Sequence, residues 1–431
     1  MTPATLADWL TLLEQRHPVA IDLGLDRVGV VADRLAARQF SCPVITVAGT
    51  NGKGSTVATL EALARAHGLS VGVYSSPHLL RFNERVRIDA ADVSDPQLLQ
   101  AFAAVEAARG DVSLTYFEFT TLAALWLFKQ TALDLLVLEV GMGGRLDAVN
   151  LVDADVAVIT TIDFDHMSFL GTTLAAIAGE KAGICRAGKP VVLADPHRFD
   201  VMLTAVQQRA ALPVRADHDF GQCSIDGQWT FRWRDDAPLQ LPTPNLGPDL
   251  VAAALAAFRL ALPQHWQPEA IARAVADARL AGRWQRMPGS PPTILDIGHN
   301  GQASQRLAQR ASQELSGRLH IVLGVLGDKD RVALLQPWRN FSSAGRSGTA
   351  QALPPRWYLA DLDGPRAGKA SDLRAALPSE ADARCFADPV AAWQTARADA
   401  AAGDSILVFG SFLTVAAVLT AAGANAATAR S

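Results

Sequence analysis

Residues 44–56 read VITVAGTNGKGST, an apolar run followed directly by glycines, a lysine and two hydroxyl side chains. Glycines let backbone N–H groups approach phosphate oxygens, and the N-terminus of a following helix adds positive potential. Lys53 supplies a mobile charge, and Ser55 or Thr56 can reach Mg²⁺. The common P-loop has about four residues between its first glycine and the Gly-Lys pair, whereas only Thr50 and Asn51 stand here. The stretch predicts a strand, a phosphate-binding loop and a helix.

Composition predicts a globular protein with two large domains. The chain has 431 residues, of which 49% are hydrophobic and 19% charged. A formal net charge of −4 gives no electrostatic reason to expect nucleic acid or an anionic membrane as a partner. The cysteines are scattered, which argues against a zinc site or a disulfide framework and fits a reducing compartment. With no leader and no membrane-spanning run recognised, we expect a soluble, cytoplasmic protein.

Apolar runs that alternate with helical segments predict a mostly parallel, doubly wound α/β sheet. We expect a helix with Leu6, Trp9, Leu10 and Leu13 on one face, a loop over 21–28, and a helix from the phosphate loop to about Ala66. The expected strands of this first domain, residues 1–287, are 44–48, 71–74, 133–140, 156–159 and 191–193.

The segment Met287–Pro292 is rich in proline and glycine and favours an extended linker. Beyond it the alternation restarts, which predicts a second, smaller α/β domain over residues 288–431. Its expected elements are a helix after Asn300 and strands at 293–297, 320–325, 357–360 and 406–409. Residues 341–355 read as a mobile surface loop, because they are rich in Ser, Gly, Ala and Pro.

Polar side chains follow several of the expected strands at their carboxyl ends, where open parallel sheets gather ligands. Ser76 follows the second strand, Glu139 ends the third, and His166 comes shortly after the fourth. Singly, each has an ordinary interpretation as a helix cap, a solvated acid or a surface turn. Together, beside a phosphate loop, they indicate a site for Mg²⁺ or Mn²⁺.

Four further residues carry candidate roles. Lys181 lies in an alanine-rich helical stretch, where residue physics alone indicates a solvated charge. Asp296 and His299 close the first strand of the second domain, again at a carboxyl end. Arg283 precedes the linker, where it can either reach a terminal phosphate or form a hinge salt bridge.

The chain resembles the folylpolyglutamate synthase/dihydrofolate synthase group of the Mur ligase superfamily. The matching segments run in family order along nearly the whole chain: IDLGLDRV (21–28), VAGTNGKGST (47–56), YSSPHL (74–79), RFNERVRI (81–88), FEFTTLAAL (117–125), LEVGMGGRLDAVN (138–150), DFDHMSFLGTT (163–173), GEKAGI (179–184), AGRWQ (281–285), LDIGHN (295–300), LGDKD (326–330) and GSFLTV (410–415). Gly301 stands where the family usually has proline, and the segment around Asn245 matches the adenine-side segment loosely.

The resemblance implies a P-loop ATPase domain that also binds the pterin, joined to a Rossmann-like glutamate-ligase domain, and a reaction in which ATP phosphorylates a carboxylate that glutamate then captures. It implies Mg²⁺ bound by Ser76, Glu139, His166 and a carbamylated Lys181, with two metal sites. The catalytic residues we expect are Lys53, Lys181 and His299. The expected ATP-binding residues are Gly49, Thr50, Asn51, Gly52, Lys53, Gly54, Ser55, Thr56, Asn245, Arg283 and Asp296. The pterin or folate set is Asp22, Leu23, Gly24, Leu25, Arg27, Thr115, Phe117, Asp147 and Ala148, and the glutamate set is His299 and Ser411.

The leading hypothesis is a monomeric, bifunctional ligase that acts on dihydropteroate, tetrahydrofolates and L-glutamate. A single-activity enzyme of the same family is a close alternative. A Mur-type ligase for a cell-wall nucleotide precursor is disfavoured by the SSPHL and GGRLDA segments. A P-loop kinase or nucleotide switch would explain the phosphate loop but would leave LDIGHN and GSFLTV without a role.

Overall fold

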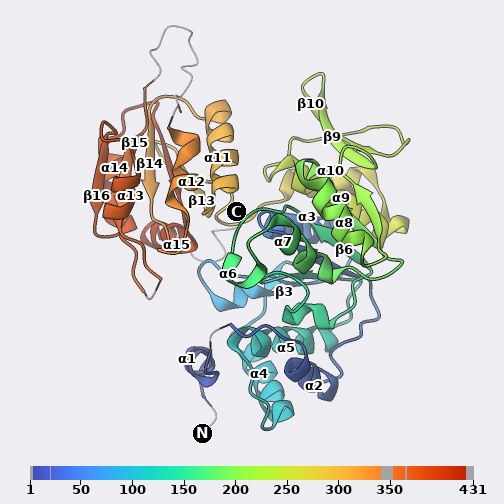
Figure 1. Cartoon of the computed structure of the whole chain (residues 1–431). Coiled ribbons are helices and arrows are strands. Elements are labelled where there is room, and N and C mark those ends of the chain that lie inside the picture. The colour runs from blue at the N-terminus through green and yellow to red at the C-terminus, as the bar shows by residue number, and fades with distance from the viewer. Residues whose placement is uncertain (1–2, 20, 340, 342–352, 365, 424–431) are drawn as a thin grey trace. The chain divides into compact units, whose positions relative to one another are not determined.

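The computed structural model describes residues 3–19, 21–339, 341, 353–364 and 366–423. Within them the chain forms two compact units, Met1–Arg279 and Leu280–Ser431 (Figure 1). The expected domain boundary after Met287 falls inside the second unit, directly behind its first strand. Most of the loop expected at 341–355 lies outside the described residues.

The first unit is built on an eight-stranded sheet in the order β4-β3-β2-β5-β1-β6-β7-β8. Its neighbouring strands pair in parallel except β2 with β3 and β3 with β4, which pair antiparallel at one edge. They are β1 (Val44–Ala48), β2 (Val71–Tyr74), β3 (Val86–Ile88), β4 (Ala91–Asp92), β5 (Leu135–Glu139), β6 (Val156–Ile159), β7 (Pro190–Leu193) and β8 (Leu212–Arg215). Strands β1, β2, β5 and β6 are buried throughout, as their continuous apolar sequences predict.

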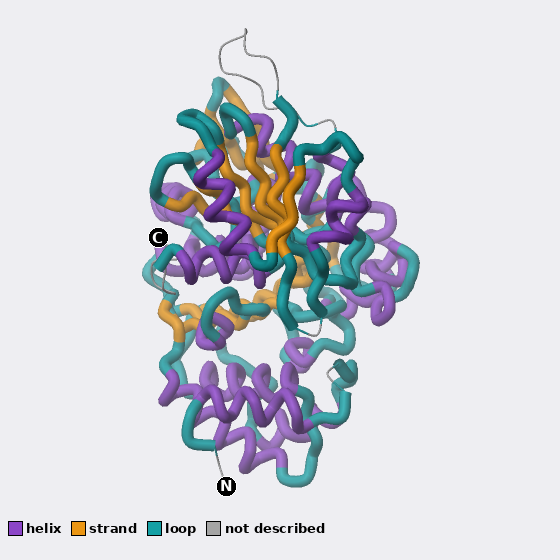
Figure 2. Tube along the Cα trace, turned by 90° about the vertical axis from the view of Figure 1, so that its left-hand side faces the viewer, coloured by secondary structure: helices purple, strands orange, loops and turns teal. Residues whose placement is uncertain are grey.

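Helices form layers around this sheet: α2 contacts α4 and α5, while α3 contacts α9 and α10. Figure 2 shows the helices nearest the N-terminus gathered in one layer. The helices of the unit are α1 (Leu6–Arg16), α2 (Asp26–Arg34), α3 (Lys53–Ala66), α4 (Asp95–Arg109), α5 (Tyr116–Lys129), α6 (Met167–Leu170), α7 (Leu174–Lys181), α8 (Phe199–Gln207), α9 (Pro248–Ala261) and α10 (Pro268–Asp277), with 3₁₀ turns η1 (Phe82–Arg85), η2 (Ala148–Leu151), η3 (Ala182–Ile184), η4 (Pro196–Arg198) and η5 (Pro263–His265).

Several expected boundaries hold and others do not. Leu6, Trp9 and Leu13 are buried on one face of α1, and α3 ends at Ala66 as expected. The loop expected over 21–28 is wrong at its end, because α2 begins at Asp26 and buries Val28. An antiparallel meander of β9 (Phe220–Ile225), β10 (Gln228–Trp233) and β11 (Leu239–Leu241) was not expected.

The second unit contains a six-stranded sheet in the order β12-β13-β17-β14-β15-β16, parallel except for β12. Its strands are β12 (Gln285–Met287), β13 (Thr293–Asp296), β14 (Leu319–Leu323), β15 (Arg356–Ala360), β16 (Ala383–Phe386) and β17 (Ser405–Phe409). Its helices are α11 (Gly301–Glu314), α12 (Arg331–Leu335), α13 (Ala370–Ala376), α14 (Pro389–Asp399) and α15 (Phe412–Ala421), with the turn η6 (Gln336–Trp338). The predicted fold class, two α/β units with mostly parallel sheets, is confirmed.

Across the described part of the chain, no helix combines the length and apolar character needed to cross a bilayer.

Candidate functional site

The phosphate loop lies between the carboxyl end of β1 and the first residue of α3, as the sequence predicts. Gly52 caps α3 with a φ of 88°, and Gly49 has a φ of 152°. Both values lie where a side chain would be strained, so glycine is required by the backbone itself. The Lys53 Nζ atom donates to the carbonyl oxygens of Gly49 at 2.9 Å and Thr50 at 3.4 Å. The lysine therefore lies against the loop that its charge would serve.

Two threonines that follow β6 hold the phosphate loop in shape. The Thr160 hydroxyl donates to the Asn51 carbonyl at 2.6 Å, and the Asn51 N–H donates to Thr161 Oγ1 at 2.9 Å. The Thr50 N–H donates to the Thr161 carbonyl at 2.8 Å. Because both threonines are fully buried, these bonds tie the loop to the central sheet. Sequence reasoning missed both residues.

The start of α9 also approaches the phosphate loop. A Cβ atom added at Gly52 would come within 2.5 Å of a Leu250 methyl group, so Leu250 packs directly on the loop. Asn245, expected on the adenine side, lies five residues earlier and is half-buried. The packing thus brings the segment that carries Asn245 toward the loop.

Lys181 is buried at the last position of α7, with a relative exposure of 3%. Burial, together with the positive charge of Lys53, lowers its pKa to about 7, and Asp165 opposes that shift. The interpretation of Lys181 as a solvated charge is therefore wrong. A buried amine with this pKa is uncharged in about half of the molecules near pH 7, and the uncharged form can act as a nucleophile.

Besides Lys181, the residues expected to hold a metal come from three different segments of the first unit. Glu139 ends β5, is buried, and stands in register beside Val47 of β1. His166 directly precedes α6 as its N-cap, with a φ of 50°, and its side chain has a relative exposure of 35%. Ser76 lies in the loop after β2 and is half-buried.

Arg87 connects two of these segments. Its guanidinium is buried and makes a bidentate pair with Glu61 of α3, and it donates to Ser75 Oγ at 3.1 Å. Glu139 is among the carboxylates that raise the pKa of Arg87 against the desolvation that lowers it. The Arg87 guanidinium therefore interacts electrostatically with Glu139, at the end of β5, and donates a hydrogen bond to the loop that carries Ser76.

The expected pterin residues meet around the start of α5. Arg27 pairs with Glu118 at 2.9 Å and also with Asp22, which ties the 22–27 segment to this helix. Thr115 caps α5 in a capping box with Glu118, and the Phe117 ring lies 6.1 Å from the Tyr74 ring. Leu23, Gly24 and Leu25 lead into α2, and Ala148 begins η2.

Asp147 joins this cluster from the segment after β5. A Cβ atom built at Gly141 would contact the Phe117 ring at 2.6 Å and Asp147 Oδ2 at 3.2 Å, so the aromatic ring and the carboxylate flank one glycine. Burial raises the pKa of Asp147 to about 6, against hydrogen bonds from the N–H groups of Met142 and Val149 and the charge of Lys53. The sheet edge thus joins the pterin candidates to the phosphate loop.

The second unit places its candidates at one edge of its own sheet. Asp296 ends β13 beside Phe409 of β17 and accepts N–H bonds from Trp284 at 2.9 Å and Gly298 at 2.8 Å. Burial raises its pKa, while Arg283, 3.7 Å away, opposes the shift. Arg283 therefore forms a salt bridge with another predicted ATP-binding residue.

His299 and Ser411 follow β13 and β17 at the same edge. The half-buried His299 has Nδ1 3.0 Å from the Ile297 carbonyl. Ser411 is buried and caps α15, accepting the Thr414 N–H at 3.0 Å. Parallel pairing of the two strands thus brings the expected glutamate residues together, although the Ser411 hydroxyl already serves a helix cap.

Sequence comparison matches two family profiles to the chain. The Mur ligase middle domain matches residues 47–211, and the Mur ligase glutamate ligase domain matches residues 282–412. The dihydrofolate synthase/folylpolyglutamate synthase of Escherichia coli is 43% identical over 96% of this chain and 94% of its own length. The protein of that name from Haemophilus influenzae is 39% identical over 95% of this chain and 96% of its own. The chain belongs to the dihydrofolate synthase/folylpolyglutamate synthase group of the Mur ligase family.

Solved structures of the family agree with the fold of this Mur ligase family member. An E. coli structure in complex with DHPP and ADP superposes with a TM-score of 0.91 at 42% identity, covering 98% of this chain and 99% of that one. A bifunctional folylpolyglutamate synthase/dihydrofolate synthase with Mn, AMPPNP and L-glutamate bound has a TM-score of 0.89 at 42% identity, covering 98% of this chain and all of that one. The resemblance read from the sequence motifs is confirmed.

The donor chemistry of this family member's first unit fits a divalent ion. No three His, Cys, Asp or Glu side chains converge on a common point among the residues that the structure describes. Of those residue types, the predicted metal-binding set contains only Glu139 and His166. Its other two members are the Ser76 hydroxyl and the proposed carbamate of Lys181. Mg²⁺ keeps several waters, so a sparse set of oxygen donors suits it.

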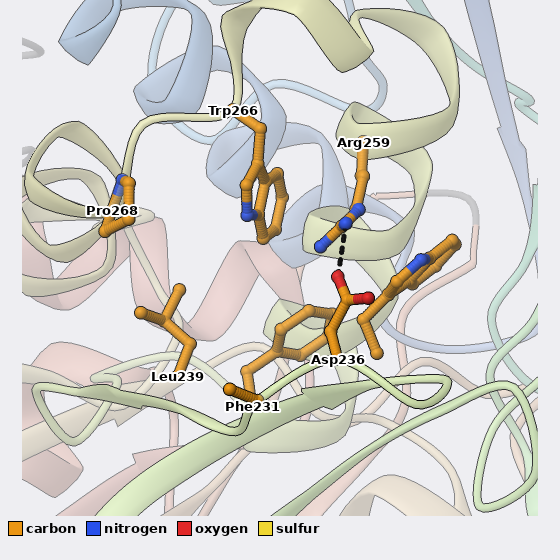
Figure 3. A pocket seen from close by; sticks show the side chains of 8 residues that line it. Phe231, Asp236, Leu239, Arg259, Trp266 and Pro268 are labelled. Atoms are coloured by element: carbon orange, nitrogen blue, oxygen red, sulfur yellow. Dashed lines mark hydrogen bonds and ion pairs between the residues drawn. The ribbon is translucent and has the colours of Figure 1, made fainter.

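A separate cavity of about 320 Å³ lies between the meander and the segment from α9 to α10 (Figure 3). The Arg259 guanidinium carbon lies 5.3 Å from the centroid of the Trp233 ring and 4.8 Å from that of Trp266, and the guanidinium pairs with Asp236. None of the predicted site residues lines this cavity. Its cation–π contacts fasten the meander to α9, which is a structural role.

Proposed function

We propose that this chain is an ATP-dependent ligase that joins L-glutamate to dihydropteroate and to the γ-carboxylate of reduced folates. The substrate carboxylate takes the γ-phosphoryl group of ATP to form an acyl phosphate and ADP. The glutamate amine then attacks the acyl carbon, and the tetrahedral intermediate expels phosphate as the amide forms. The observation that carries the proposal is the phosphate loop, with Lys53 beside the buried Lys181 and Asp147 at one sheet edge.

Phosphoryl transfer needs positioning and charge neutralisation more than covalent chemistry. The backbone N–H groups of residues 49–56 hold the phosphates, and Lys53 supplies positive charge to the group in transfer. The acid substrate lies along Asp22–Arg27, Thr115, Phe117 and Asp147, with its carboxylate toward the phosphate loop. Asn245, Arg283 and Asp296 bind the nucleotide, and His299 with Ser411 binds glutamate.

Ser76, Glu139, His166 and Lys181 hold the magnesium ions. When bound, Mg²⁺ neutralises the charge that develops on the transferring phosphoryl group. Lys181 carries a carbamate: its uncharged amine adds to CO₂, forming an N–C bond and releasing a proton. The burial and lowered pKa of Lys181 support this step, because a protonated amine could not add to CO₂.

Use of dihydropteroate, rather than folates alone, is supported by the cluster that joins Arg27 to Glu118 and Asp147 to Phe117. The relatives named above carry both activities in their names. A single-activity enzyme remains the second candidate. We propose that the chain functions as a monomer.

A phosphate-release assay tests the proposal. Purified protein receives ATP, Mg²⁺ and bicarbonate with either dihydropteroate or tetrahydrofolate, each with and without L-glutamate. We expect sustained phosphate release with both acids, and only when glutamate is present. Release with one acid alone indicates a single-activity enzyme, and release independent of glutamate indicates a kinase or hydrolase.

A further inference from the structure

The loop between β2 and β3, residues 75–85, carries two side chains that the proposed chemistry does not yet use. Glu84 fixes the middle of this loop, because its carboxylate accepts the N–H groups of Leu79 and Leu80 at 2.8 Å. The Ser75 N–H donates to the Arg85 carbonyl at 2.9 Å, which closes the loop at its two ends. Within this rigid frame His78 and Arg85 face each other, and the Arg85 Nε–H donates to His78 Nδ1 at 2.9 Å.

Arg85 is a half-buried cation held by rings rather than by an acid. Its guanidinium carbon lies 5.6 Å from the centroid of Phe82 and 5.7 Å from that of Tyr116. Within the described ranges no carboxylate pairs with Arg85, and its terminal nitrogens donate to no recorded acceptor. Its neighbours differ, since Arg81 pairs with Asp95 and Arg87 with Glu61. A guanidinium fork without a counter-ion is suited to a ligand carboxylate.

His78 adds a second donor to the same place. An arginine N–H can only donate, so His78 Nδ1 must accept and the ring proton of the neutral imidazole lies on Nε2. The His78 ring lies 6.1 Å from the Phe82 ring, on which Arg85 also stacks. The imidazole thus fixes the guanidinium and offers an N–H of its own to an anion.

We propose that Arg85 and His78 bind the carboxylate of the acid substrate that becomes phosphorylated. This inference rests on the proposed function and adds the residues that recognise the reacting group. Tyr116, on which Arg85 stacks, stands between the pterin candidates Thr115 and Phe117. Ser76, a proposed metal ligand, lies between Ser75 and His78 in the same loop. Arg85 therefore contacts both the first turn of α5, which carries the pterin candidates, and the residue next to Ser76, and in the proposed arrangement the reacting carboxylate lies near both.

Neither co-substrate competes for this position in the proposed arrangement. The nucleotide phosphates have the backbone loop of residues 49–56, and glutamate has candidates only in the second unit. The acid substrate is the remaining anion. Both dihydropteroate and the folates present a reacting carboxylate, so both should depend on Arg85.

Equilibrium binding of each ligand by itself, measured by calorimetry without metal, tests the inference. The ligands are dihydropteroate, its decarboxylated analogue, tetrahydrofolate and ADP, and the variants are Arg85→Gln, Arg85→Lys and His78→Phe. Arg81→Gln is the matched control, because it removes an exposed cation from the same loop. We expect Arg85→Gln to lower the affinity for dihydropteroate roughly 10- to 100-fold, because it removes a charge-assisted pair of hydrogen bonds. Arg85→Lys and His78→Phe should lower the affinity for dihydropteroate by less, and Arg81→Gln should leave it unchanged.

The analogue and the co-substrates distinguish this role from others. The decarboxylated analogue should bind the wild type and Arg85→Gln equally, and ADP affinity should not change. Equal weakening of both pterins would mean that Arg85 supports the rings and would overturn the inference. Weaker binding of ADP would also overturn the inference. The same holds if Arg85→Gln weakens the binding of tetrahydrofolate alone, because a carboxylate that dihydropteroate lacks would then be the ligand. If the wild-type protein binds dihydropteroate but releases no phosphate, the proposed function is refuted while the binding role of Arg85 still stands.

Discussion

Replacement of Gly49 by alanine should dismantle the phosphate loop, because the sheet behind that glycine has no space for a methyl group. A Cβ atom at Gly49 would lie 1.8 Å from Thr160 Oγ1 and 3.1 Å from the Thr161 nitrogen. Its φ of 152° is also a strained conformation for alanine. Gly68 provides the matched control, because its φ is also positive, at 73°, but nothing lies within 4 Å of its Cβ position.

The magnitude follows from three costs at Gly49. Backbone strain contributes about 1–3 kcal/mol, and overpacking against Thr160 contributes about 1–3 kcal/mol. Displacing Thr160 also disturbs its hydroxyl bond to the Asn51 carbonyl, which is worth about 1 kcal/mol. We expect Gly49→Ala to lose on the order of 5 kcal/mol, against about 1 kcal/mol for Gly68→Ala.

Thermal unfolding and ADP titration measure the effect. A loss of this size lowers Tm by about 8–10 °C for a unit of this length, and ADP binding should disappear. Adding Thr160→Ala should recover part of the stability, because the nearest remaining atom, the Cβ of residue 160, is 3.0 Å away. If Gly49→Ala unfolds within a few degrees of Gly68→Ala and still binds ADP, the close approach of the threonine is not what shapes the loop.

Three further outcomes follow from the half-buried Lys53 and the buried Lys181. Lys53→Ala should abolish ATP turnover with little change in Tm, whereas Lys189→Ala, which removes an exposed lysine, should keep normal turnover; near-normal turnover in Lys53→Ala would contradict the phosphate-loop assignment. Lys181→Ala should lose activity that Lys181→Glu partly restores, because the working group is anionic, and full activity in the alanine variant would exclude that role. Lys181→Met should be more stable than the wild type in bicarbonate-free buffer, because the pKa of Lys181 in the folded protein, about 7, lies below the ordinary 10.5. The free-energy cost of the buried charge is therefore absent above pH 10.5 and grows as the pH falls. Below pH 7 it levels off at about 5 kcal/mol. Urea unfolding at pH 7 and pH 10 checks this, and an advantage no greater at pH 7 would refute it.

The parts of the fold that are specified locally could be predicted from the sequence. The strand β1, the phosphate loop and α3 follow from one continuous motif, and β2, β5 and β6 from uninterrupted apolar runs. The meander β9–β11 could not, because β9 mixes glycine with exposed polar residues and exists through its pairing with β10. The start of α2 was missed for a related reason: its helical state depends on burying Val28 and Val31, which is a tertiary effect.

The candidate site divides in the same way. Residues carried by motifs, such as Lys53 and Glu139, could be found from the sequence, because the motif is the signal. Thr160 and Thr161 could not, since they act on residues about 110 positions earlier in the chain through bonds that only the folded sheet brings together. Their placement directly after an apolar strand, opposite the strand of the phosphate loop, was the one signal that sequence reasoning could have used.

The burial of Lys181 near Lys53 sets the protonation state of Lys181. Desolvation makes the charged form of Lys181 costly and repulsion from Lys53 adds to that cost, so the pKa of the lysine deeper in the fold falls to about 7. A solvated Lys181 would keep its proton and stay inert toward CO₂. The same burial that makes Lys181 costly as a cation therefore prepares it to become an anion. Conversion to a carbamate would replace a repulsive pair with an attractive one and would add oxygen donors beside the phosphate loop, where the proposed chemistry needs them.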